Sequence, residues 1–293
     1  MSEVEKISAI STAELQPREA WTRVGGLNVR YQTAGSGPAL VLLHGLLGYS
    51  FSWRHTIPIL AKNAQIFAPD MPGAGLSDCG SGLDCRLSSA ADRLLQFLDS
   101  IGVSSCDLIG SSYGGTTAMA LAQVVPHRIR HLVLVSPANP WSKNGRRRLR
   151  FLRNTAVSWI FPKLARPMRF LHAYFVRRMY GDPRKVTPET LAGYARPLAL
   201  HGRFEHAVRI VRSWDADMHD LRERILPGIS EIPTLIIWGS KDRVVDPASA
   251  KQLASYFKEV KTEIISGSGH MPYEENPGAF ARIVLDFLFP RLL

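Results

Sequence analysis

The sequence predicts an α/β fold: a mostly parallel, doubly wound sheet with one inserted helical segment. Short apolar runs typical of buried strands alternate along the chain with segments of helical periodicity, which is the pattern of strand–helix–strand units. One long stretch, residues 140–226, instead lacks any strand-like run and has a helical period. With 293 residues, 45% of them apolar, the chain can build a sizeable core around such a sheet.

The N-terminal part of the chain predicts an arm, a hairpin and the first inner strands. Residues 1–20 are polar and are expected to form a loosely held arm. Alternating residues on both sides of Gly25-Gly26 predict a β-hairpin, because paired glycines readily form the tight turn between two strands. The hairpin strands, the two apolar strands that follow and the next helix are expected at residues 22–24, 27–32, 39–43, 65–68 and 87–101.

Residues 106–115, Cys-Asp-Leu-Ile-Gly-Ser-Ser-Tyr-Gly-Gly, predict a strand, a tight turn and a helix. Within them, Gly110-Ser111-Ser112-Tyr113-Gly114 fits Gly-x-Ser-x-Gly, the nucleophile-elbow motif, which exposes a serine hydroxyl above the sheet. The flanking glycines let the strand and the helix approach closely. Ser112 stands at the centre of the motif, so we expect it to be the nucleophile in preference to the adjacent Ser111.

Two later loops offer an acid and a base for this serine. After a strand at 131–135, the buried-strand pattern Leu235–Trp238 ends in a loop that carries Asp242. A further short strand ends in a Gly-rich loop that carries His270. Both side chains follow the carboxyl ends of strands, where ligand sites gather in parallel sheets. The chain order Ser112, Asp242, His270 matches the order of the elbow motif's fold.

Asp246 is the alternative acid in the first of these loops. It precedes Pro247, a pairing typical of a helix start, so a capping role is expected for Asp246 and the acid role for Asp242. The helix that Asp246 begins is expected at 246–257, and a final amphipathic helix at 279–289.

With these residues in place, the chain resembles the cap-bearing branch of the α/β-hydrolase superfamily from about Trp21 to its C-terminus. Four further segments carry the resemblance: Leu40–Leu46 with its His-Gly turn, Phe51–Arg54 as in epoxide hydrolases and dehalogenases, Ala68–Ser77 and Gly269–Pro277. The resemblance implies the α/β-hydrolase fold, with a core formed by residues 21–139 and 227–293 and a helical cap at 140–226.

For the site, the resemblance implies that His270 takes the Ser112 proton while Asp242 orients the imidazole. The backbone N–H groups of Leu46 and Tyr113 are expected to bind the oxyanion. His44 is an alternative base, but its place in the His-Gly turn indicates a structural histidine. The residues expected to line the substrate pocket are His44, Gly45, Trp53, Trp141 and Met271. Core packing is an equal alternative for the two tryptophans.

The expected cap carries the positive charge of the chain. Residues 141–185 hold 13 Lys or Arg and one acid, Asp182, a net charge of +12 against +11 for the whole chain. Aromatic residues such as Trp159 and Phe161 are interleaved with them. Three roles are weighed: a solvated roof over a pocket, adsorption to an anionic membrane that delivers lipid-like esters, and recognition of a carboxylate- or phosphate-bearing substrate. Nucleic-acid binding is not expected, because no recognition motif accompanies the charge.

The identity of the nucleophile sets the reaction class that we expect. Epoxide hydrolases and dehalogenases carry an aspartate at the position of Ser112, because water cleaves the alkyl ester that an aspartate forms. A serine would form an ether that water does not cleave, whereas its acyl-enzyme is an ester that His270 can hydrolyse. We therefore expect a serine hydrolase of carboxylic esters, esterase- or lipase-like. Acyl transfer or perhydrolysis would change only the acyl acceptor.

Two alternatives stay open. A carbon–carbon bond hydrolase of the meta-cleavage-product type uses the same triad, but that group usually has Gly-Pro-Gly after the His-Gly turn and an aromatic residue after the catalytic histidine. Here the residues are Leu46-Leu47-Gly48 and Met271. The other alternative is a non-catalytic member whose cap binds a membrane or an acidic partner, and the intact triad argues against it.

Composition predicts neither a cofactor nor a metal site. The nine histidines show no metal-binding spacing, and the three cysteines (Cys79, Cys85 and Cys106) are expected to be reduced. The first residues include acids and no long apolar run, so a secretory signal is not expected. We expect a cytoplasmic monomer or homodimer that acts on a small-molecule ester, with peripheral membrane association through the cap as one of the alternatives.

Overall fold

The computed structural model describes residues 14–80, 82–142 and 169–290. An eight-stranded sheet runs through it in the order β1-β2-β4-β3-β5-β6-β7-β8. The hairpin β1–β2 and the pair β2–β4 are antiparallel, and every later pair is parallel. The strands are β1 (Arg18–Val24), β2 (Leu27–Ala34), β3 (Ala39–Leu43), β4 (Gln65–Pro69), β5 (Cys106–Ser111), β6 (Ile129–Val135), β7 (Thr234–Gly239) and β8 (Val260–Ile265).

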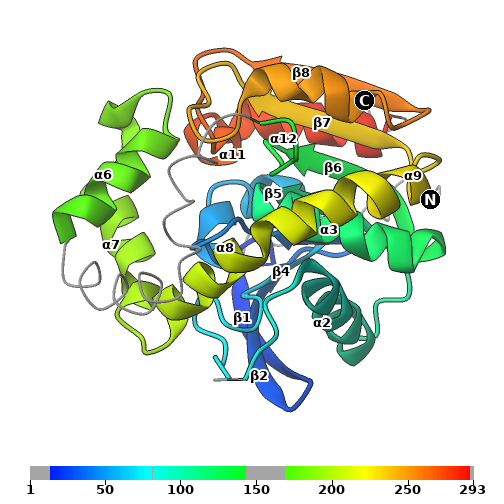
Figure 1. Cartoon of the computed structure of the whole chain (residues 1–293). Coiled ribbons are helices and arrows are strands. Elements are labelled where there is room, and N and C mark those ends of the chain that lie inside the picture. The colour runs from blue at the N-terminus through cyan, green and yellow to red at the C-terminus, as the bar shows by residue number, and fades with distance from the viewer. Residues whose placement is uncertain (1–13, 81, 143–168, 291–293) are drawn as a thin grey trace, which may run out of the picture.

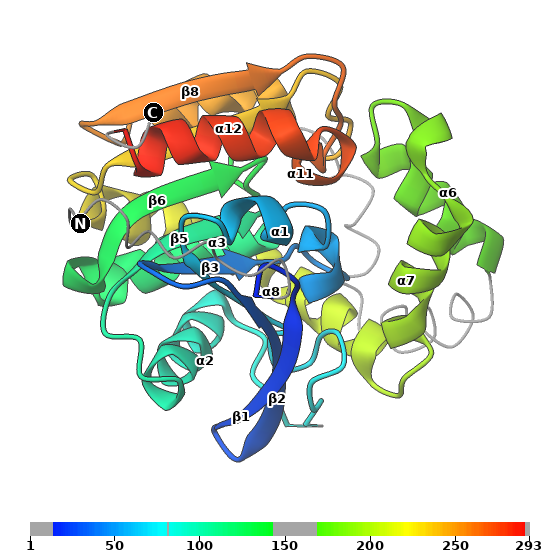
Figure 2. The ribbon, with the colours of Figure 1, turned by 180° about the vertical axis from the view of Figure 1, so that it is seen from behind.

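Helices cover both faces of the sheet (Figures 1 and 2). On one face lie α2 (Leu87–Ser100), α3 (Tyr113–Val124), α9 (Leu226–Gly228) and α10 (Ala250–Ala254). On the other lie α1 (Ile57–Leu60), α11 (Pro272–Glu275) and α12 (Pro277–Leu288). This is the doubly wound arrangement that the alternation of strands and helices predicts.

The inner strands form two hydrophobic cores because their side chains alternate between the faces of the sheet. In β3, Val41 and Leu43 belong to the cluster under α2 and α3, and Leu40 and Leu42 belong to the cluster under α1 and α12. All four are at most 1% exposed. The apolar run that predicted a buried strand is therefore buried from both sides.

The observed elements match the expected ones except at some boundaries. The hairpin strand β1 begins at Arg18, inside the segment expected to be an arm, because residues 18–24 pair with residues 27–33 of β2. The single helix expected at 246–257 is a short 3-10 turn at Pro247–Ser249 followed by α10. Residues of the expected arm before Leu15 fall almost wholly outside the described part of the chain.

The expected cap contributes α6 (Arg169–Met179), α7 (Pro188–Leu198) and α8 (Arg203–Asp220) to the described residues. Figures 1 and 2 show α6 and α7 beyond one end of the sheet, whereas α8 runs back along the face that carries α3. Residues 143–168, which hold eight of the 13 Lys and Arg residues of the segment 141–185, lie outside the described part. Among the described helices, none combines the length and the apolarity that crossing a bilayer requires.

The last helix of the expected cap belongs partly to the core. The Asp217 carboxylate accepts a hydrogen bond from the backbone N–H of Leu87 at 3.1 Å, at the start of α2. Met218 and the π-helical turn Leu221–Ile225 add apolar side chains to the cluster under α2 and α3. The chain therefore packs into the core before residue 226, where the cap was expected to end.

Candidate active site

Ser112 lies in a strained turn between β5 and α3. Its φ of 53° and ψ of −119° fall in the left-handed half of backbone space, which a residue with a side chain rarely adopts. Neighbouring backbone holds it there, because Ser112 N–H donates to Val135 O at 2.9 Å and Ser112 O accepts from Ala138 N–H at 3.1 Å. A side chain at Gly114 would overlap the backbone of His44, so this turn requires glycine after the serine. The motif therefore forms the sharp elbow that it predicts.

Asp242 and His270 lie together in the interior. Asp242 Oδ2 is 2.8 Å from His270 Nδ1, and the side chains of both residues are buried. The other carboxylate oxygen accepts the backbone N–H groups of Val244 and Val245 at 2.7 and 3.0 Å. Burial alone would raise the pKa of Asp242, but His270 and these N–H groups outweigh it and hold the pKa below its ordinary value. The ionised acid fixes the Nδ1–H tautomer of His270 and leaves Nε2 as the acceptor.

The structure does not join Ser112 to His270 by a hydrogen bond within the described residues. It connects their surroundings instead. The Ser111 hydroxyl donates to the Tyr273 hydroxyl at 3.2 Å, which links the last residue of β5 to the helix that follows His270. Ser111 is buried and points into this contact, whereas Ser112 is only partly buried.

Asp246 occupies a different position from Asp242. Its carboxylate accepts the Ala248 N–H at 3.0 Å and so caps the turn at Pro247–Ser249. This is the capping contact that a residue before proline predicts. Asp242 is the carboxylate that reaches His270.

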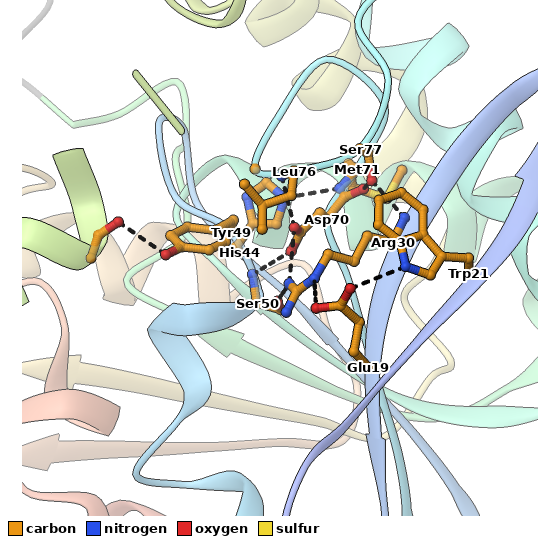
Figure 3. A network of polar contacts seen from close by, with 12 residues as sticks. Glu19, Trp21, Arg30, His44, Tyr49, Ser50, Asp70, Met71, Leu76 and Ser77 are labelled. Atoms are coloured by element: carbon orange, nitrogen blue, oxygen red, sulfur yellow. Dashed lines mark hydrogen bonds and ion pairs between the residues drawn. The ribbon is translucent and has the colours of Figure 1, made fainter. Parts of the chain in front are cut away.

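His44 is held as a structural residue, and Figure 3 shows its surroundings. Its Nδ1 lies 2.9 Å from Gly45 O, and its Nε2 accepts the Met71 N–H at 3.1 Å, so both ring nitrogens are occupied. Burial lowers the pKa of His44, which keeps the ring neutral. The imidazole therefore fastens the His-Gly turn to the loop after β4.

That loop is itself fixed by a buried ion pair, also drawn in Figure 3. The fully buried carboxylate of Asp70 accepts the backbone N–H groups of Ser50 and Leu76 at 2.8 and 2.9 Å, and Arg30 lies 3.2 Å away. Arg30 in turn pairs with Glu19 of β1 at 2.7 Å. The Asp in the segment Ala68–Ser77 thus shapes the loop.

The two expected oxyanion donors are unoccupied within the described residues. The backbone N–H groups of Leu46 and Tyr113 donate to no acceptor there, whereas Gly48 N–H closes the adjacent turn on Gly45 O at 3.0 Å. A Cβ atom at Gly45 would lie 3.1 Å from Ser112 Cβ. Gly45 therefore lets the His-Gly turn sit against the serine, and Tyr113 N–H lies at the start of α3, where negative charge is favoured.

A cavity begins beside these donors. Its walls come from the loops at 43–48 and 71–75, from α2 and α3, and from the facing parts of α7 and α8. Of the five expected pocket residues, His44 and Gly45 line it, together with Leu46 and Tyr113.

The other three expected pocket residues lie outside the walls of this cavity. Trp53 is fully buried and stacks on Tyr273 with ring centroids 4.2 Å apart. Trp141 packs against Tyr256, and Met271 is buried under α7. For Trp53 the structure therefore shows the core-packing alternative.

Two adjacent acids hold the histidine loop to the cap, and the sequence analysis did not single them out. The Glu275 carboxylate accepts the backbone N–H groups of Gly269 at 2.6 Å and of Gly181 at 2.9 Å. His270 N–H donates to Met179 O, the last residue of α6, at 2.6 Å. Glu274 and Glu275 are 7% and 6% exposed. A pair of acids normally indicates solvent exposure, so no sequence signal marked them as buried.

Glu274 completes the junction between cap and core. It accepts hydrogen bonds from the hydroxyls of Tyr180 and Tyr194, and Arg54 lies 3.1 Å away. Burial raises the pKa of Glu274, although Arg54 and the two tyrosines oppose that rise. The segment Phe51–Arg54 therefore serves to anchor the cap. No cluster of three or more metal-ligating side chains occurs within residues 14–80, 82–142 and 169–290.

Comparison with known proteins places this geometry among relatives. A family model described as alpha/beta hydrolase fold matches residues 38–277. The chain is 28% identical over 289 residues to monoacylglycerol lipase abhd6-B of Xenopus laevis, covering 92% of this chain and 84% of that protein. It is 26% identical over 275 residues to 2-hydroxy-6-oxo-2,4-heptadienoate hydrolase of Pseudomonas putida, covering 90% and 94%. The structure of Cfl2 from Burkholderia cenocepacia superposes with a TM-score of 0.83 at 24% identity, covering 93% of this chain and 96% of that one.

Proposed function

The chain belongs to the alpha/beta hydrolase fold family, and we propose that within it the protein is a serine hydrolase that cleaves carboxylic esters. The observation that carries this proposal is the buried Asp242–His270 pair, 2.8 Å apart, on the sheet whose elbow presents Ser112 in a left-handed turn. The sequence similarity to a monoacylglycerol lipase supports an ester substrate.

The proposed reaction has two halves. Ser112 Oγ attacks the ester carbonyl while His270 Nε2 takes its proton, and the N–H groups of Leu46 and Tyr113 receive the negative charge of the oxyanion. His270 then protonates the leaving alcohol, which leaves an acyl-enzyme. In the second half His270 takes a proton from water, the resulting hydroxide releases the acid, and the proton returns to Ser112. Asp242 stabilises the imidazolium in both halves.

A carbon–carbon bond hydrolase is the second candidate, favoured by the similarity to 2-hydroxy-6-oxo-2,4-heptadienoate hydrolase. It would use the same three side chains. The two candidates differ in substrate. An ester hydrolase cleaves simple esters, whereas the carbon–carbon bond hydrolase cleaves a dienoate, and the consumption of the dienoate can be measured from its absorbance. Rapid turnover of the dienoate with slow turnover of every ester would favour the second candidate.

We also propose that the face of α6 contacts an anionic membrane. Tyr174 and Phe175 are 57% and 49% exposed on this helix, and Arg177 and Arg178 follow them in its last turn. Exposed aromatic rings beside arginines are typical of helices that lie in the headgroup region of a bilayer. Such contact would bring a lipase-like site to its substrate.

The first test is hydrolysis of p-nitrophenyl esters from acetate to palmitate by the wild-type protein and by Ser112→Ala. We expect the substitution to lower kcat by at least about 10⁴-fold, because removing one member of such a triad disables the whole unit. The chain length with the highest kcat/KM would measure the usable depth of the pocket.

Ser111→Ala is the matched comparison, because it removes a neighbouring hydroxyl that the structure places against Tyr273. A fluorophosphonate that acylates activated serines should label the wild type and Ser111→Ala but not Ser112→Ala. Ester turnover that survives unchanged in Ser112→Ala would overturn the proposed nucleophile.

A further inference from the structure

Arg93 lies in the wall of the cavity and has no hydrogen-bond or ion-pair partner within the described residues. It extends from α2 and lines the cavity together with Ala90 of the same helix. Its Nε is buried and has no acceptor. Its other guanidinium nitrogens likewise make no hydrogen bond or ion pair with any residue of the described ranges. A buried donor left unpaired destabilises a fold, so this arrangement calls for an acceptor from outside the protein.

The other cationic groups around the cavity are already engaged or neutral. Arg203 also lines it, but its Nε donates to Gly75 O at 3.0 Å and its terminal nitrogen donates to Ser77 O. Burial, with neighbouring arginines, lowers the pKa of His206 to about 3, so this lining imidazole is neutral near pH 7. Among the described lining residues, Arg93 is thus the cation that is left for a ligand.

Among the residues that the structure describes, no carboxylate lines the cavity. The acids that act on Arg93 from nearby are Asp84 and Asp92. Asp84 is held by Arg86 at 2.7 Å and by the Ser89 hydroxyl at 2.8 Å, and Asp92 is exposed on the outer side of α2. Neither carboxylate neutralises the Arg93 guanidinium inside the cavity, so the electrostatic field there favours a negatively charged ligand.

The cavity also extends from Arg93 to the proposed oxyanion donors. Leu46 and Tyr113, whose N–H groups are the proposed oxyanion donors, line the same space. The Tyr113 phenol lies close enough to Arg93 for the two to interact electrostatically. A substrate whose carbonyl oxygen lies on those donors would therefore extend toward the guanidinium.

We propose that Arg93 binds an anionic oxyacid group, a carboxylate or a phosphate, at the end of the substrate remote from the ester carbonyl. The planar guanidinium suits both groups, because each presents two oxygens to its parallel N–H bonds. The proposal rests on the proposed hydrolase function and gives its substrate class: esters that carry a negative charge beyond an apolar spacer.

The test compares esters of equal length that differ in terminal charge. We expect the wild type to prefer the p-nitrophenyl monoester of adipate, or an analogue ending in phosphate, over p-nitrophenyl hexanoate in kcat/KM. Arg93→Met should lower kcat/KM for the anionic esters by about 10- to 100-fold, as expected for losing a charge-assisted hydrogen bond, and should leave the neutral ester nearly unaffected. Arg93→Lys should keep part of the preference.

Arg23→Met is the matched control, because it removes one exposed arginine charge in the β1–β2 hairpin, outside the cavity. The control variant should leave kcat/KM unchanged for both the anionic and the neutral esters. The two anionic esters separate carboxylate from phosphate as the group recognised. Equal losses for neutral and anionic esters in Arg93→Met, together with a lower Tm, would show a merely structural role and overturn the proposal.

Binding to Ser112→Ala separates this proposal from the proposed chemistry. Calorimetry with monomethyl adipate, hexyl phosphate and neutral methyl hexanoate reports the anion site even if no ester is turned over. Tighter binding of an anionic probe that Arg93→Met abolishes supports the site. Equal affinity for all three probes, or anion binding that persists in Arg93→Met, overturns it.

Discussion

At the scale of single residues, the site works through the neighbours that fix each protonation state. Asp242 stays ionised because the imidazole and two backbone N–H groups outweigh its burial. His44 stays neutral because burial disfavours its charged form. The two histidines of the site therefore have different tasks: within the described residues His270 Nε2 makes no hydrogen bond, whereas His44 is bound at both nitrogens.

His206 carries a prediction about acid stability. Its ring is 5% exposed, packs on Gly73 and lies 3.5 Å from Cys85 Sγ. Burial and nearby arginines lower its pKa from 6.5 to about 3. Below pH 6.5 the imidazole of His206 binds a proton in the unfolded chain but stays neutral in the folded chain. The free energy of unfolding therefore falls as the pH falls toward 3. Between pH 7 and pH 5 this single group should lower the free energy of unfolding by about 2 kcal/mol.

Urea unfolding at the two pH values measures this contribution. In His206→Gln the difference between pH 7 and pH 5 should shrink by that amount, whatever the variant's stability at pH 7. His219→Gln, exposed on the same helix, should retain the wild-type difference. The same pH dependence in wild type and His206→Gln would contradict the assignment.

The proposed site residues differ in whether a local sequence pattern marks them. Ser112, Asp242 and His270 follow strand ends within short motifs, so local pattern and chain order were enough to select them. Arg93 occupies one position of an ordinary amphipathic helix, and only the absence of a folded partner distinguishes it. Whether Arg93 has a partner in the folded protein depends on contacts between residues distant in sequence, and helical periodicity does not reveal such contacts.

At the scale of elements, the short helix α11 and the end of α6 behave as one structural unit with the histidine loop. Glu275 joins Gly269 of the loop to Gly181 just beyond α6, and His270 N–H binds α6 directly. Glu274 adds α7 through Tyr194. Movement of the cap helices would therefore move the loop that carries the proposed base.

Glu275→Gln tests this coupling. The amide loses the charge that the backbone N–H groups bind and turns a donor toward them, so the free energy of unfolding should fall by about 2–3 kcal/mol. We expect kcat for esters to fall as well, with a smaller effect on KM, because the altered loop carries His270. Glu231→Gln, which removes an exposed acid paired with Lys258, should change neither quantity. A variant with lower stability but unchanged kcat would show that the junction does not position the base.

Element boundaries show what periodicity can and cannot give. The strand predicted at 39–43 and the helix predicted at 87–101 agree closely with β3 and with α2, which ends at Ser100, because their patterns end at turns or polar residues. The end of the cap was not, because Met218, Leu221 and Ile225 continue the helical spacing of α8 without a break. Where one helix passes from the cap to the core, its apolar residues pack against a different part of the protein, but their helical spacing stays the same.

At the scale of the whole molecule, positive charge is concentrated in one segment. Residues 141–185 have a net charge of +12, so the remainder of the chain is close to neutral. The described part of this segment also places two exposed aromatic residues, Tyr174 and Phe175, on α6. The sequence revealed the charge, but the exposure of the aromatic pair required the packing of α6.

We predict binding to vesicles that contain anionic lipid and little binding to zwitterionic ones. Raising the salt from 0.05 to 0.5 M should weaken binding severalfold, because it shortens the screening length to less than half. Replacing both Tyr174 and Phe175 by Ser should weaken binding further at either salt concentration. Val124→Ser, at an apolar position on α3 that is 48% exposed, is the matched control in a sedimentation assay. Equal binding to both vesicle types would contradict an electrostatic contact.

The left-handed backbone of Ser112 has a consequence for how the protein can be improved. A side chain in that conformation costs roughly 1–3 kcal/mol, which glycine at the same position would largely avoid. Glycine in place of Ser112 would therefore raise thermal stability but remove the hydroxyl that turnover requires. A mutant library screened by heating alone would enrich inactive replacements at this position, so each round of selection must also require the reaction.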